Sequence, residues 1–268
     1  MKIKNSIIVI TGGASGIGRI MGRMALEKGA KAVAIWDINE KNMEAVSAEH
    51  AALGRCKGYK VDVANMDSVK AAYADTVKDL GEVDILINCA GVVTTNKTFD
   101  QNTESDIVRT ININTIAPMF VARTMLPDMI RRDRGHICNI ASAAGLLSNP
   151  RMSVYAASKW AAMGWSDSVC IELKEMKSNV HVTTLAPYYI NTGMFDGVKS
   201  KFFPILDPEK TSAKILRAIE RNTRFKGIPF SFRFTRLMQG ILSMSCVDWI
   251  FGNVFGIYHT MDHFTGRK

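Results

Sequence analysis

The chain has 268 residues, of which 47% are hydrophobic and 22% are charged, with 20 Gly and 7 Pro. These values fit one or two globular domains and exclude a disordered chain, a collagen-like repeat and a small disulfide scaffold. The five cysteines are scattered, with no CxxC pair and no Cys/His cluster at metal-ligand spacing. We therefore expect a reduced cytoplasmic protein with no metal site.

Positive charge is concentrated toward the end of the sequence. The formal net charge is +9, and residues 199–268 contain twelve Lys or Arg against five Asp or Glu. No nucleic-acid-binding motif accompanies this charge, so we expect no nucleic-acid partner. Near the beginning, the apolar run from Ile7 to Ile10 is too short for a signal peptide core or a membrane span.

Short β-branched runs alternate with longer helical patterns along the chain. The expected strands are residues 7–11, 32–36, 56–61, 84–88, 136–141 and 180–186, and the expected helices are residues 16–28, 40–52, 67–80, 103–131 and 153–176. The strands are almost continuously apolar, which is typical of parallel strands covered by helices on both faces. The sequence therefore predicts an α/β fold: a single doubly wound Rossmann-type domain over residues 1–268, with about seven parallel strands and a C-terminal helical lid.

The first strand ends in the glycine-rich segment TGGASGIG, residues 11–18, which leads into a helix. Backbone N–H groups and the positive end of the helix dipole favour a pyrophosphate at such a turn. The candidate cofactor residues here are Gly12, Ser15, Gly16, Ile17 and Gly18. A glycine pattern alone is also typical of an ordinary flexible turn, so further support is needed.

Asp37 supplies that support, because it ends the second strand nineteen residues after Gly18. A carboxylate at this place accepts hydrogen bonds from the ribose hydroxyls of NAD and repels the 2′-phosphate of NADP. Neither Lys nor Arg occupies positions 14, 15, 38 or 39, so NADP lacks an obvious partner. The sequence predicts NAD as the cofactor.

A second set of residues points to proton transfer. Tyr155 and Lys159 are four residues apart on a predicted helix, with Ser142 thirteen residues earlier and Asn114 on the preceding helix. On one helix face the ammonium group would lower the pKa of the phenol, making it a usable base near neutral pH. A single YxxxK pair is more often a solvent-facing pair, so the interpretation depends on the whole set.

Together these motifs resemble the short-chain dehydrogenase/reductase family. The resemblance rests on TGGASGIG, Asp37, Asp62-Val63, INCAG, Asn114, Ser142, YAASK and LAPYYINTGMF, in the expected order over about residues 5–195. Within that family, PYYINTGMFDG and the long tail are similar to the branch containing retinol dehydrogenases and 17β-hydroxysteroid dehydrogenases.

The resemblance implies a role for each matching residue. Tyr155 would exchange the proton of the substrate oxygen, Ser142 would hydrogen-bond that oxygen, Lys159 would bind the nicotinamide ribose, and Asn114 would orient Lys159 through water. Asp62 and Val63 would contact adenine, Asn88, Ala90 and Gly91 would lie on the ribose side, Thr192 would touch the carboxamide, and Pro187 would be a further cofactor contact.

Three positions depart from the family pattern, one of them Ala141, where many members have a second Ser before Ser142. Cys89 replaces the second Asn of the turn after the fourth strand, and Tyr188 follows Pro187 where a Gly is usual. The Tyr188 substitution adds an aromatic ring beside the expected substrate pocket. We expect Tyr188, Phe195 and Trp249 to be substrate residues.

Residues 195–268 form an expected substrate loop and lid, with a helix beginning near Asp207 and a last strand about FKGIPF. From Leu237 to Tyr258 the single charge is Asp248. Two short helices that fold over the site or rest on a membrane surface would suit this composition, and so would an ordinary buried helix pair. In the lid interpretation, Trp249 and either Phe251 or Phe255 face the pocket, and the basic tail makes peripheral membrane contact.

The sequence thus predicts an NAD-dependent oxidoreductase that interconverts an alcohol and a carbonyl on an apolar steroid- or retinoid-like substrate, as a homodimer or homotetramer. One alternative is a 3-oxoacyl carrier-protein reductase, which the Asp37 argument disfavours. The other is a non-catalytic NAD-binding interaction protein, which the intact set of Asn114, Ser142, Tyr155 and Lys159 disfavours.

Overall fold

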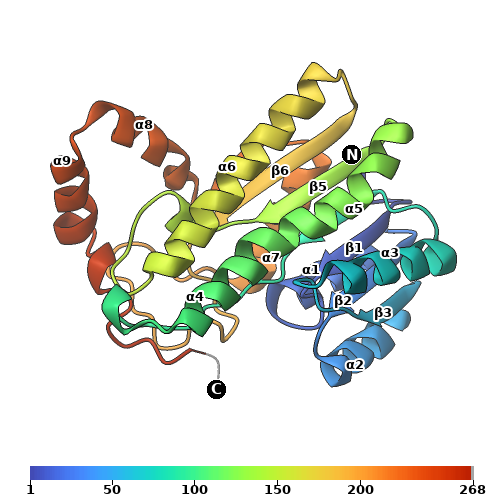
Figure 1. The fold of residues 1–268 in the computed structure, drawn as a ribbon, viewed down its shortest axis with the longest axis horizontal. Coiled ribbons are helices and arrows are strands. Elements are labelled where there is room, and N and C mark those ends of the chain that lie inside the picture. Colours follow the sequence, from blue (N-terminus) through green and yellow to red (C-terminus); the bar gives the residue numbers. More distant parts are fainter. Residues whose placement is uncertain (267–268) are drawn as a thin grey trace.

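The structure is a computed structural model, and it describes residues 1–266. Seven parallel strands form one sheet in the order β3-β2-β1-β4-β5-β6-β7 (Figure 1). They are β1 (Ile7–Thr11), β2 (Ala32–Asp37), β3 (Cys56–Lys60), β4 (Ile85–Asn88), β5 (Gly135–Ile140), β6 (Val180–Pro187) and β7 (Phe225–Ile228). The doubly wound α/β fold is confirmed, and the six strands predicted before the tail match these bounds to within one residue.

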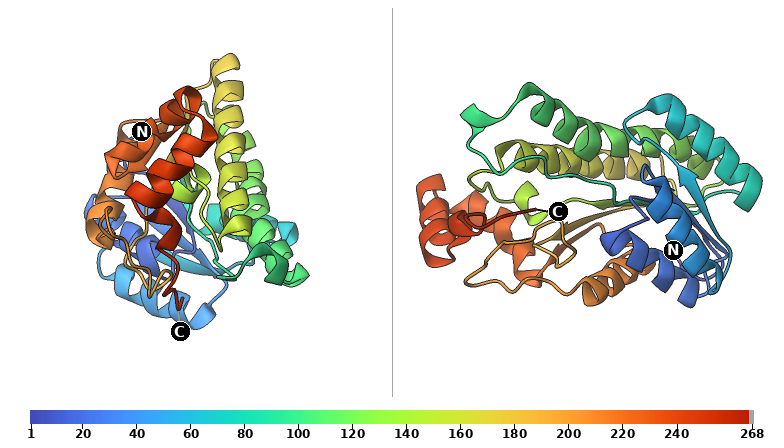
Figure 2. Two further views of the ribbon diagram at one scale, coloured as in Figure 1. Left: turned by 90° about the vertical axis from the view of Figure 1, so that its left-hand side faces the viewer. Right: turned by 90° about the horizontal axis from the view of Figure 1, so that it is seen from below.

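Helices cover both faces of the sheet. One face carries α3 (Met66–Leu80), α5 (Ala117–Arg131) and α6 (Ser153–Glu175), and the other carries α1 (Gly16–Glu27), α2 (Glu40–Ala51) and α7 (Pro208–Glu220) (Figure 2). Alternation along β1 divides the apolar core between the two layers: Ile7 and Val9 pack with α3 and α5, whereas Ile8 and Ile10 pack with α1 and α2. Successive strand residues point to opposite faces, so one short strand contributes to both layers.

Strand β3 differs from the expectation that all strands are covered on both faces. It lies at the edge of the sheet, and of its residues only Tyr59 is buried. The Lys57 ammonium binds Asp79 on α3, with 2.7 Å between nitrogen and oxygen. A charged edge strand is less able to pair with another chain.

The helix expected over residues 103–131 is interrupted. It consists of α4 (Glu104–Ile111), a π-helical turn over Asn112–Ile116 and then α5. The apolar periodicity of the sequence runs through the π turn, which explains why a single helix was expected. The turn holds Asn114, one of the candidate catalytic residues, and π turns inside helices are often found at functional sites.

The tail after β7 forms short elements at one end of the sheet (Figures 1 and 2). They are a 3₁₀ turn (Phe230–Phe234), α8 (Thr235–Ile241), α9 (Met244–Asp248), a second π turn (Trp249–Val254) and a 3₁₀ turn (Ile257–His259). Phe232, Phe251 and Ile257 join a third apolar cluster together with Tyr155 and Tyr188. In residues 1–266, none of the helices has the length and apolar character that crossing a membrane requires.

Candidate active site

The strand order reverses between β1 and β4, because β1 continues to β2 on one side while the later strands add on the other. In doubly wound sheets, ligands bind where the carboxyl ends of the strands diverge at such a reversal. The Thr11 hydroxyl at the end of β1 accepts hydrogen bonds from the backbone N–H groups of Cys89 and Ala90, at 3.0 and 3.2 Å. These bonds hold the two diverging strand ends together.

The glycine-rich turn after β1 fits closely against its neighbours. Gly12 has φ +66°, and a Cβ atom there would lie 2.9 Å from the Cα atom of Ala90. A Cβ atom on Gly18 would lie 2.2 Å from the carbonyl oxygen of Gly12, so only glycine fits there. Helix α1 begins at Gly16 and has no acidic residue in its first turn. Its exposed N–H groups and helix dipole therefore suit the pyrophosphate of a dinucleotide.

Asp37 lies beside this turn, and its carboxylate is positioned by the backbone. One oxygen accepts a hydrogen bond from Ala14 N and the other from Asn39 N, each at 3.0 Å. Asp37 borders an open cleft, here called the outer cleft, with about 1340 Å³ of empty space. The predicted cofactor residues that line it are Gly12, Ser15, Asp37, Asp62, Val63, Ala90 and Gly91.

The outer cleft adjoins a second hollow, here called the inner cavity, with about 820 Å³ of empty space. The two share Gly12, Ser15, Ala90, Gly91 and Val92. Predicted residues that line the inner cavity are Gly12, Ser15, Gly16, Ile17, Gly18, Ala90, Gly91, Ser142, Tyr155, Lys159, Pro187, Thr192 and Phe195. The cofactor and catalytic candidates are thus brought together along one continuous hollow, which the glycine cradle and the carboxylate make suitable for a nicotinamide dinucleotide.

Asn88 is an exception among the predicted cofactor residues. It is buried at the end of β4, and its side chain donates to Asn139 Oδ1 at 2.8 Å and to the Pro118 carbonyl at 3.4 Å. It lines neither the outer cleft nor the inner cavity. The expectation that this side chain faces the ribose is corrected: its amide links β4 to β5 and α5 beneath the turn.

Ser142 and Tyr155 converge on the inner cavity from two elements. Ser142 follows β5 and caps a 3₁₀ turn (Ala143–Gly145), accepting a hydrogen bond from Ala144 N at 3.2 Å. Tyr155 and Lys159 lie one turn apart on α6 and are both buried. The Lys159 ammonium donates to the Ile140 carbonyl at 3.2 Å and lies 5.6 Å from the centre of the Tyr155 ring.

The electrostatics of this pair differ from the expectation that Lys159 makes Tyr155 acidic. Burial raises the pKa of the Tyr155 phenol to about 12, and the Ser142 hydroxyl offsets only part of that rise. Burial also lowers the pKa of Lys159 to about 8. Because burial removes both groups from water, it disfavours the charged form of each. In the unliganded protein, Tyr155 is therefore a protonated acid rather than a preformed base.

Asn114 supports the site from the π turn. Its Oδ1 atom accepts from Val92 N at 2.8 Å, while its Nδ2 atom donates to the Val92 carbonyl at 2.9 Å and to Ser158 Oγ at 3.2 Å. A Cβ atom on Gly91 would lie 3.3 Å from Asn114 Oδ1 and 3.6 Å from Lys159 Nζ. Asn114 thus fixes the loop after β4 beside Lys159, and the water-mediated contact with Lys159 stays a prediction.

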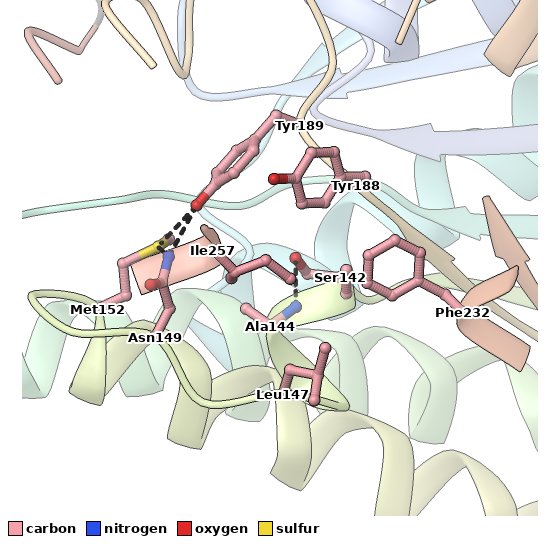
Figure 3. A pocket seen from close by; sticks show the side chains of 10 residues that line it. Ser142, Ala144, Leu147, Asn149, Met152, Tyr188, Tyr189, Phe232 and Ile257 are labelled. Atoms are coloured by element: carbon pink, nitrogen blue, oxygen red, sulfur yellow. Dashed lines mark hydrogen bonds between the residues drawn. The ribbon is translucent and has the colours of Figure 1, made fainter. Parts of the chain in front are cut away.

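A third and small hollow, the side cavity, borders Ser142 and has a volume of about 30 Å³ (Figure 3). Its lining is Ser142, Ala143, Ala144, Leu147, Asn149, Met152, Tyr188, Tyr189, Phe232 and Ile257. Ser142 borders both the side cavity and the inner cavity. A substrate in the side cavity would therefore place its reacting group against the catalytic residues.

The three substrate candidates have different outcomes. Tyr188 lines the side cavity and stacks on Phe232, with 5.5 Å between ring centres, and Phe195 lines the inner cavity edge-on to Tyr155 at 6.0 Å. Trp249 is 60% exposed and borders none of these hollows. The expectation that Trp249 and either Phe251 or Phe255 face the pocket is therefore wrong: Phe251 is buried in the third apolar cluster with Phe255 packed against it, and neither ring lines one of the three hollows.

Sequence reasoning missed several lining residues. Val108, Arg109 and Asn112 border the outer cleft from α4 and the π turn, and Ile140, Ile190 and Met194 border the inner cavity. Ile190 and Met194 lie inside the LAPYYINTGMF motif, which could have indicated them, whereas the other four belong to no motif that singles them out. Among residues 1–266, no three or more His, Cys, Asp or Glu side chains gather as they would around a metal ion.

Comparison with known proteins agrees with this geometry. A family model described as short chain dehydrogenase matches residues 6–201. The chain belongs to the short-chain dehydrogenase family. It is an oxidoreductase of the NAD- or NADP-dependent kind, and its fold and site match that chemistry.

Among curated proteins, the chain is similar to epidermal retinol dehydrogenase 2 of Mus musculus, with 33% identity over 99% of this chain and 87% of that protein. It is also similar to estradiol 17-beta-dehydrogenase 11 of Pongo abelii, with 31% identity over 90% of this chain and 80% of that protein. The branch expected from the sequence is thereby confirmed.

Two solved structures share the fold. A short chain dehydrogenase/reductase from Burkholderia phymatum, in complex with NAD, aligns with a TM-score of 0.82 and 23% identity over 90% of this chain and 95% of that chain. A metagenomic short-chain oxidoreductase in complex with NADP aligns with a TM-score of 0.71 and 26% identity over 83% of this chain and 94% of that chain. The two complexes hold different dinucleotides, so they leave the choice between NAD and NADP open.

The lowered pKa of Lys159 predicts a pH-dependent stability difference. Between pH 8 and 10.5 the unfolded chain binds a proton on Lys159 that the folded chain does not, so wild-type stability rises with pH in that window. A Lys159→Met variant lacks this proton. The free energy of unfolding of Lys159→Met minus that of wild type should therefore fall by about 3 kcal/mol between pH 7 and pH 10.5.

Urea unfolding without cofactor, at a series of pH values, measures this difference. Tyr155 titrates in both proteins and cancels in the comparison. The Lys174→Met variant, exposed on the same helix, controls for loss of a positive charge. A gap between Lys159→Met and wild type that stays constant with pH would mean that Lys159 remains charged in the folded protein.

Proposed function

We propose that this protein is an NAD-dependent dehydrogenase for an apolar alcohol of steroid- or retinoid-like size, working on the alcohol and on the matching carbonyl. The observation that carries this proposal is the side cavity, which opens at Ser142 and is lined mainly by Leu147, Phe232 and other apolar side chains. Ligand sites with an apolar lining and a few convergent polar groups select apolar substrates. The names of the two curated relatives, a retinol and an estradiol dehydrogenase, support the same substrate class.

Each residue of the site then has its own role in this reaction. A bound nicotinamide dinucleotide supplies the hydride acceptor for the alcohol, or the hydride donor for the carbonyl. Ser142 holds the substrate oxygen by a hydrogen bond, and Tyr155 Oη gives a proton to that oxygen in reduction and takes it back in oxidation. Lys159 is placed to bind the ribose and to favour the phenolate when its ammonium is charged. The apolar ring of Phe195 keeps water from Tyr155.

A panel of steroid, retinoid and aliphatic alcohols, followed by the absorbance of reduced cofactor, tests this function. The Tyr155→Phe variant keeps the ring but loses the exchangeable proton, so its turnover should fall about a hundredfold or more with little change in cofactor affinity. Substantial turnover in Tyr155→Phe would remove Tyr155 from the acid–base role. Faster turnover of carrier-protein thioesters than of any alcohol would favour the 3-oxoacyl reductase alternative.

NAD rather than NADP is part of the proposal. Asp37 borders the outer cleft, where its charge would face the ribose hydroxyls, and the two backbone donors hold it in place. Repulsion between this carboxylate and a 2′-phosphate would exclude NADP. Arg109 is the single basic side chain among the described residues that line the cleft.

The Asp37→Asn variant should lower kcat/KM for NAD and raise it for NADP. The ratio of kcat/KM for NAD to that for NADP should therefore fall about tenfold or more. Asparagine keeps an acceptor for Ala14 N, so the turn is preserved. Asp62→Asn removes a charge from the same cleft and should weaken both cofactors alike. A wild-type protein that already prefers NADP would overturn the charge argument.

We further propose that the tail makes peripheral membrane contact. Its exposed apolar side chains are Phe230, Phe234, Leu237, Ile241, Met244, Trp249 and Val254, each between 46% and 72% exposed. The Arg233 guanidinium lies over the Phe230 ring, 4.8 Å from its centre. Apolar side chains beside basic ones suit an anionic lipid surface. In this arrangement the exposed Trp249 side chain would contact lipid rather than the active site.

Flotation with phosphatidylserine-containing vesicles tests the membrane proposal. Binding should be strong at low salt and weaken at high salt. The double variant Leu237→Asp, Ile241→Asp should weaken it by about tenfold or more, because both side chains would have to enter lipid. Leu53→Asp, exposed elsewhere on the molecule, is the matched control. No flotation at low salt, or an equal loss with Leu53→Asp, would contradict the proposal.

We also propose a cytoplasmic homodimer or homotetramer. All five cysteines are free, which suits a reducing compartment. Val108 on α4 and Trp160 and Ile171 on α6 are exposed apolar residues that suit contact with a second copy. Sedimentation velocity measures the mass of the assembly, and fractionation of cells measures the location; a monomer or an organelle-resident protein would contradict these two expectations.

A further inference from the structure

The last part of the tail lies along the loop that follows β6. Residues 260–266, here called the C-terminal strap, are hydrogen-bonded to loop residues 193–201, which form no helix or strand. The Asp196 carbonyl accepts from two N–H groups of the strap, at 2.8 and 3.3 Å, and Lys199 N donates to the Thr260 carbonyl at 3.2 Å. These are the bonds that join the backbone of this loop to the rest of the described chain.

A close contact at Gly197 brings the strap and the loop together. Gly197 has φ +83°, and a Cβ atom there would overlap the carbonyl oxygen of His263. Only glycine lets the two backbones approach so closely. A side chain at this position would push the strap away from the loop.

The strap is also attached to two other parts of the molecule. Asn96, in the loop after β4, donates from its Nδ2 atom to the Met261 carbonyl at 2.9 Å. Arg151, just before α6, forms an ion pair with Asp262, with 2.6 Å between nitrogen and oxygen. The strap is therefore a support fixed to the domain, against which the loop is held.

Phe195 connects this support with the active site. It lies two residues before Gly197, and its ring centre is 6.4 Å from that of Phe264 in the strap. The same ring is edge-on to Tyr155 at 6.0 Å and to Tyr189 at 5.0 Å, and it lines the inner cavity. One aromatic side chain thus lies next to both the strap and the phenol.

We propose that the C-terminal strap positions Phe195 against Tyr155, and that Gly197 and Phe264 are therefore positioning residues for the proton transfer. The inference rests on the acid–base role of Tyr155 in the proposed function, and it extends the machinery of that reaction to the end of the tail. A ring held against the phenol excludes water and fixes the geometry of proton transfer, whereas a displaced loop would do neither.

Phe264→Ala tests the proposal, because it removes the ring of the strap that lies beside Phe195. Its kcat should fall about tenfold. Its KM for NAD should change little, since no residue of the strap lines the outer cleft or the inner cavity. Phe264→Leu keeps an apolar side chain and should restore most of the lost kcat. Gly240→Ala in α8, where a Cβ atom meets nothing within 4 Å, is the control in the same tail.

A double-variant cycle shows whether Phe264 acts through Phe195. The variant that combines Phe195→Ala with Phe264→Ala should have the same kcat as Phe195→Ala alone, because the strap then has no ring to position. Gly197→Ala, which disturbs the contact from the loop side, should lose as much kcat as Phe264→Ala. Losses that multiply in the double variant would overturn the proposal.

Ionisation of Tyr155 without cofactor gives a readout that does not need turnover. Burial raises the pKa of Tyr155 to about 12, and Ser142, Lys159 and Tyr189 are the polar groups that face it. Water admitted by a displaced loop should lower this pKa, so the ionised fraction at pH 11 should rise from about a tenth to about half or more in Phe264→Ala. Phenolate absorbance, taken as the difference from the same protein with Tyr155→Phe, measures this fraction.

The two readouts separate this inference from the proposed function. If Tyr155→Phe keeps its turnover while the ionisation of Tyr155 depends on Phe264, the acid–base role fails and the positioning by the strap stands. If Phe264→Ala matches Gly240→Ala in both kcat and ionised fraction, the positioning is overturned and the proposed reaction is unaffected.

Discussion

The site depends on the reversal of strand order between β1 and β4. At that place the carboxyl ends of two neighbouring strands diverge, and the Thr11 hydroxyl holds the loop after β4 against the glycine-rich turn through the N–H groups of Cys89 and Ala90. Gly12 packs directly against Ala90, and Gly18 packs directly against Gly12. The glycine-rich turn and the loop after β4 take their positions from this join. A side chain at Gly12 or Gly18 would force the turn away from its neighbours.

Burial determines the protonation states of Tyr155 and Lys159 within the site. Tyr155 and Lys159 lie in an environment that disfavours charge, so the phenol holds its proton and the pKa of the amine falls to about 8. The i, i+4 spacing placed them on one helix face, as the sequence indicated, but spacing carries no information on how much water reaches them.

Local patterns were sufficient for most of the fold, and for those site residues that belong to the continuous motifs. Strand positions followed from apolar runs, and the turn residues followed from glycine chemistry. The sequence did not predict the π turn at Asn112–Ile116, because its apolar spacing is the same as that of an α-helix. Trp249 was misplaced because the tail has apolar residues on every side, and which ring turns inward is decided by packing against Tyr188 and Phe232.

The third apolar cluster joins the tail to Tyr155 and Tyr188, so it affects when the site is completed during synthesis. Every predicted dinucleotide residue lies before residue 193, whereas Phe232 and Ile257, which complete the lining of the side cavity, are made among the last. Domains begin to fold while the chain emerges, from the N-terminal part onward. The part of the chain with the predicted dinucleotide residues can therefore fold early, whereas the side cavity is complete only after the tail has been made. Dinucleotide recognition and substrate choice are acquired at different moments in the life of one chain.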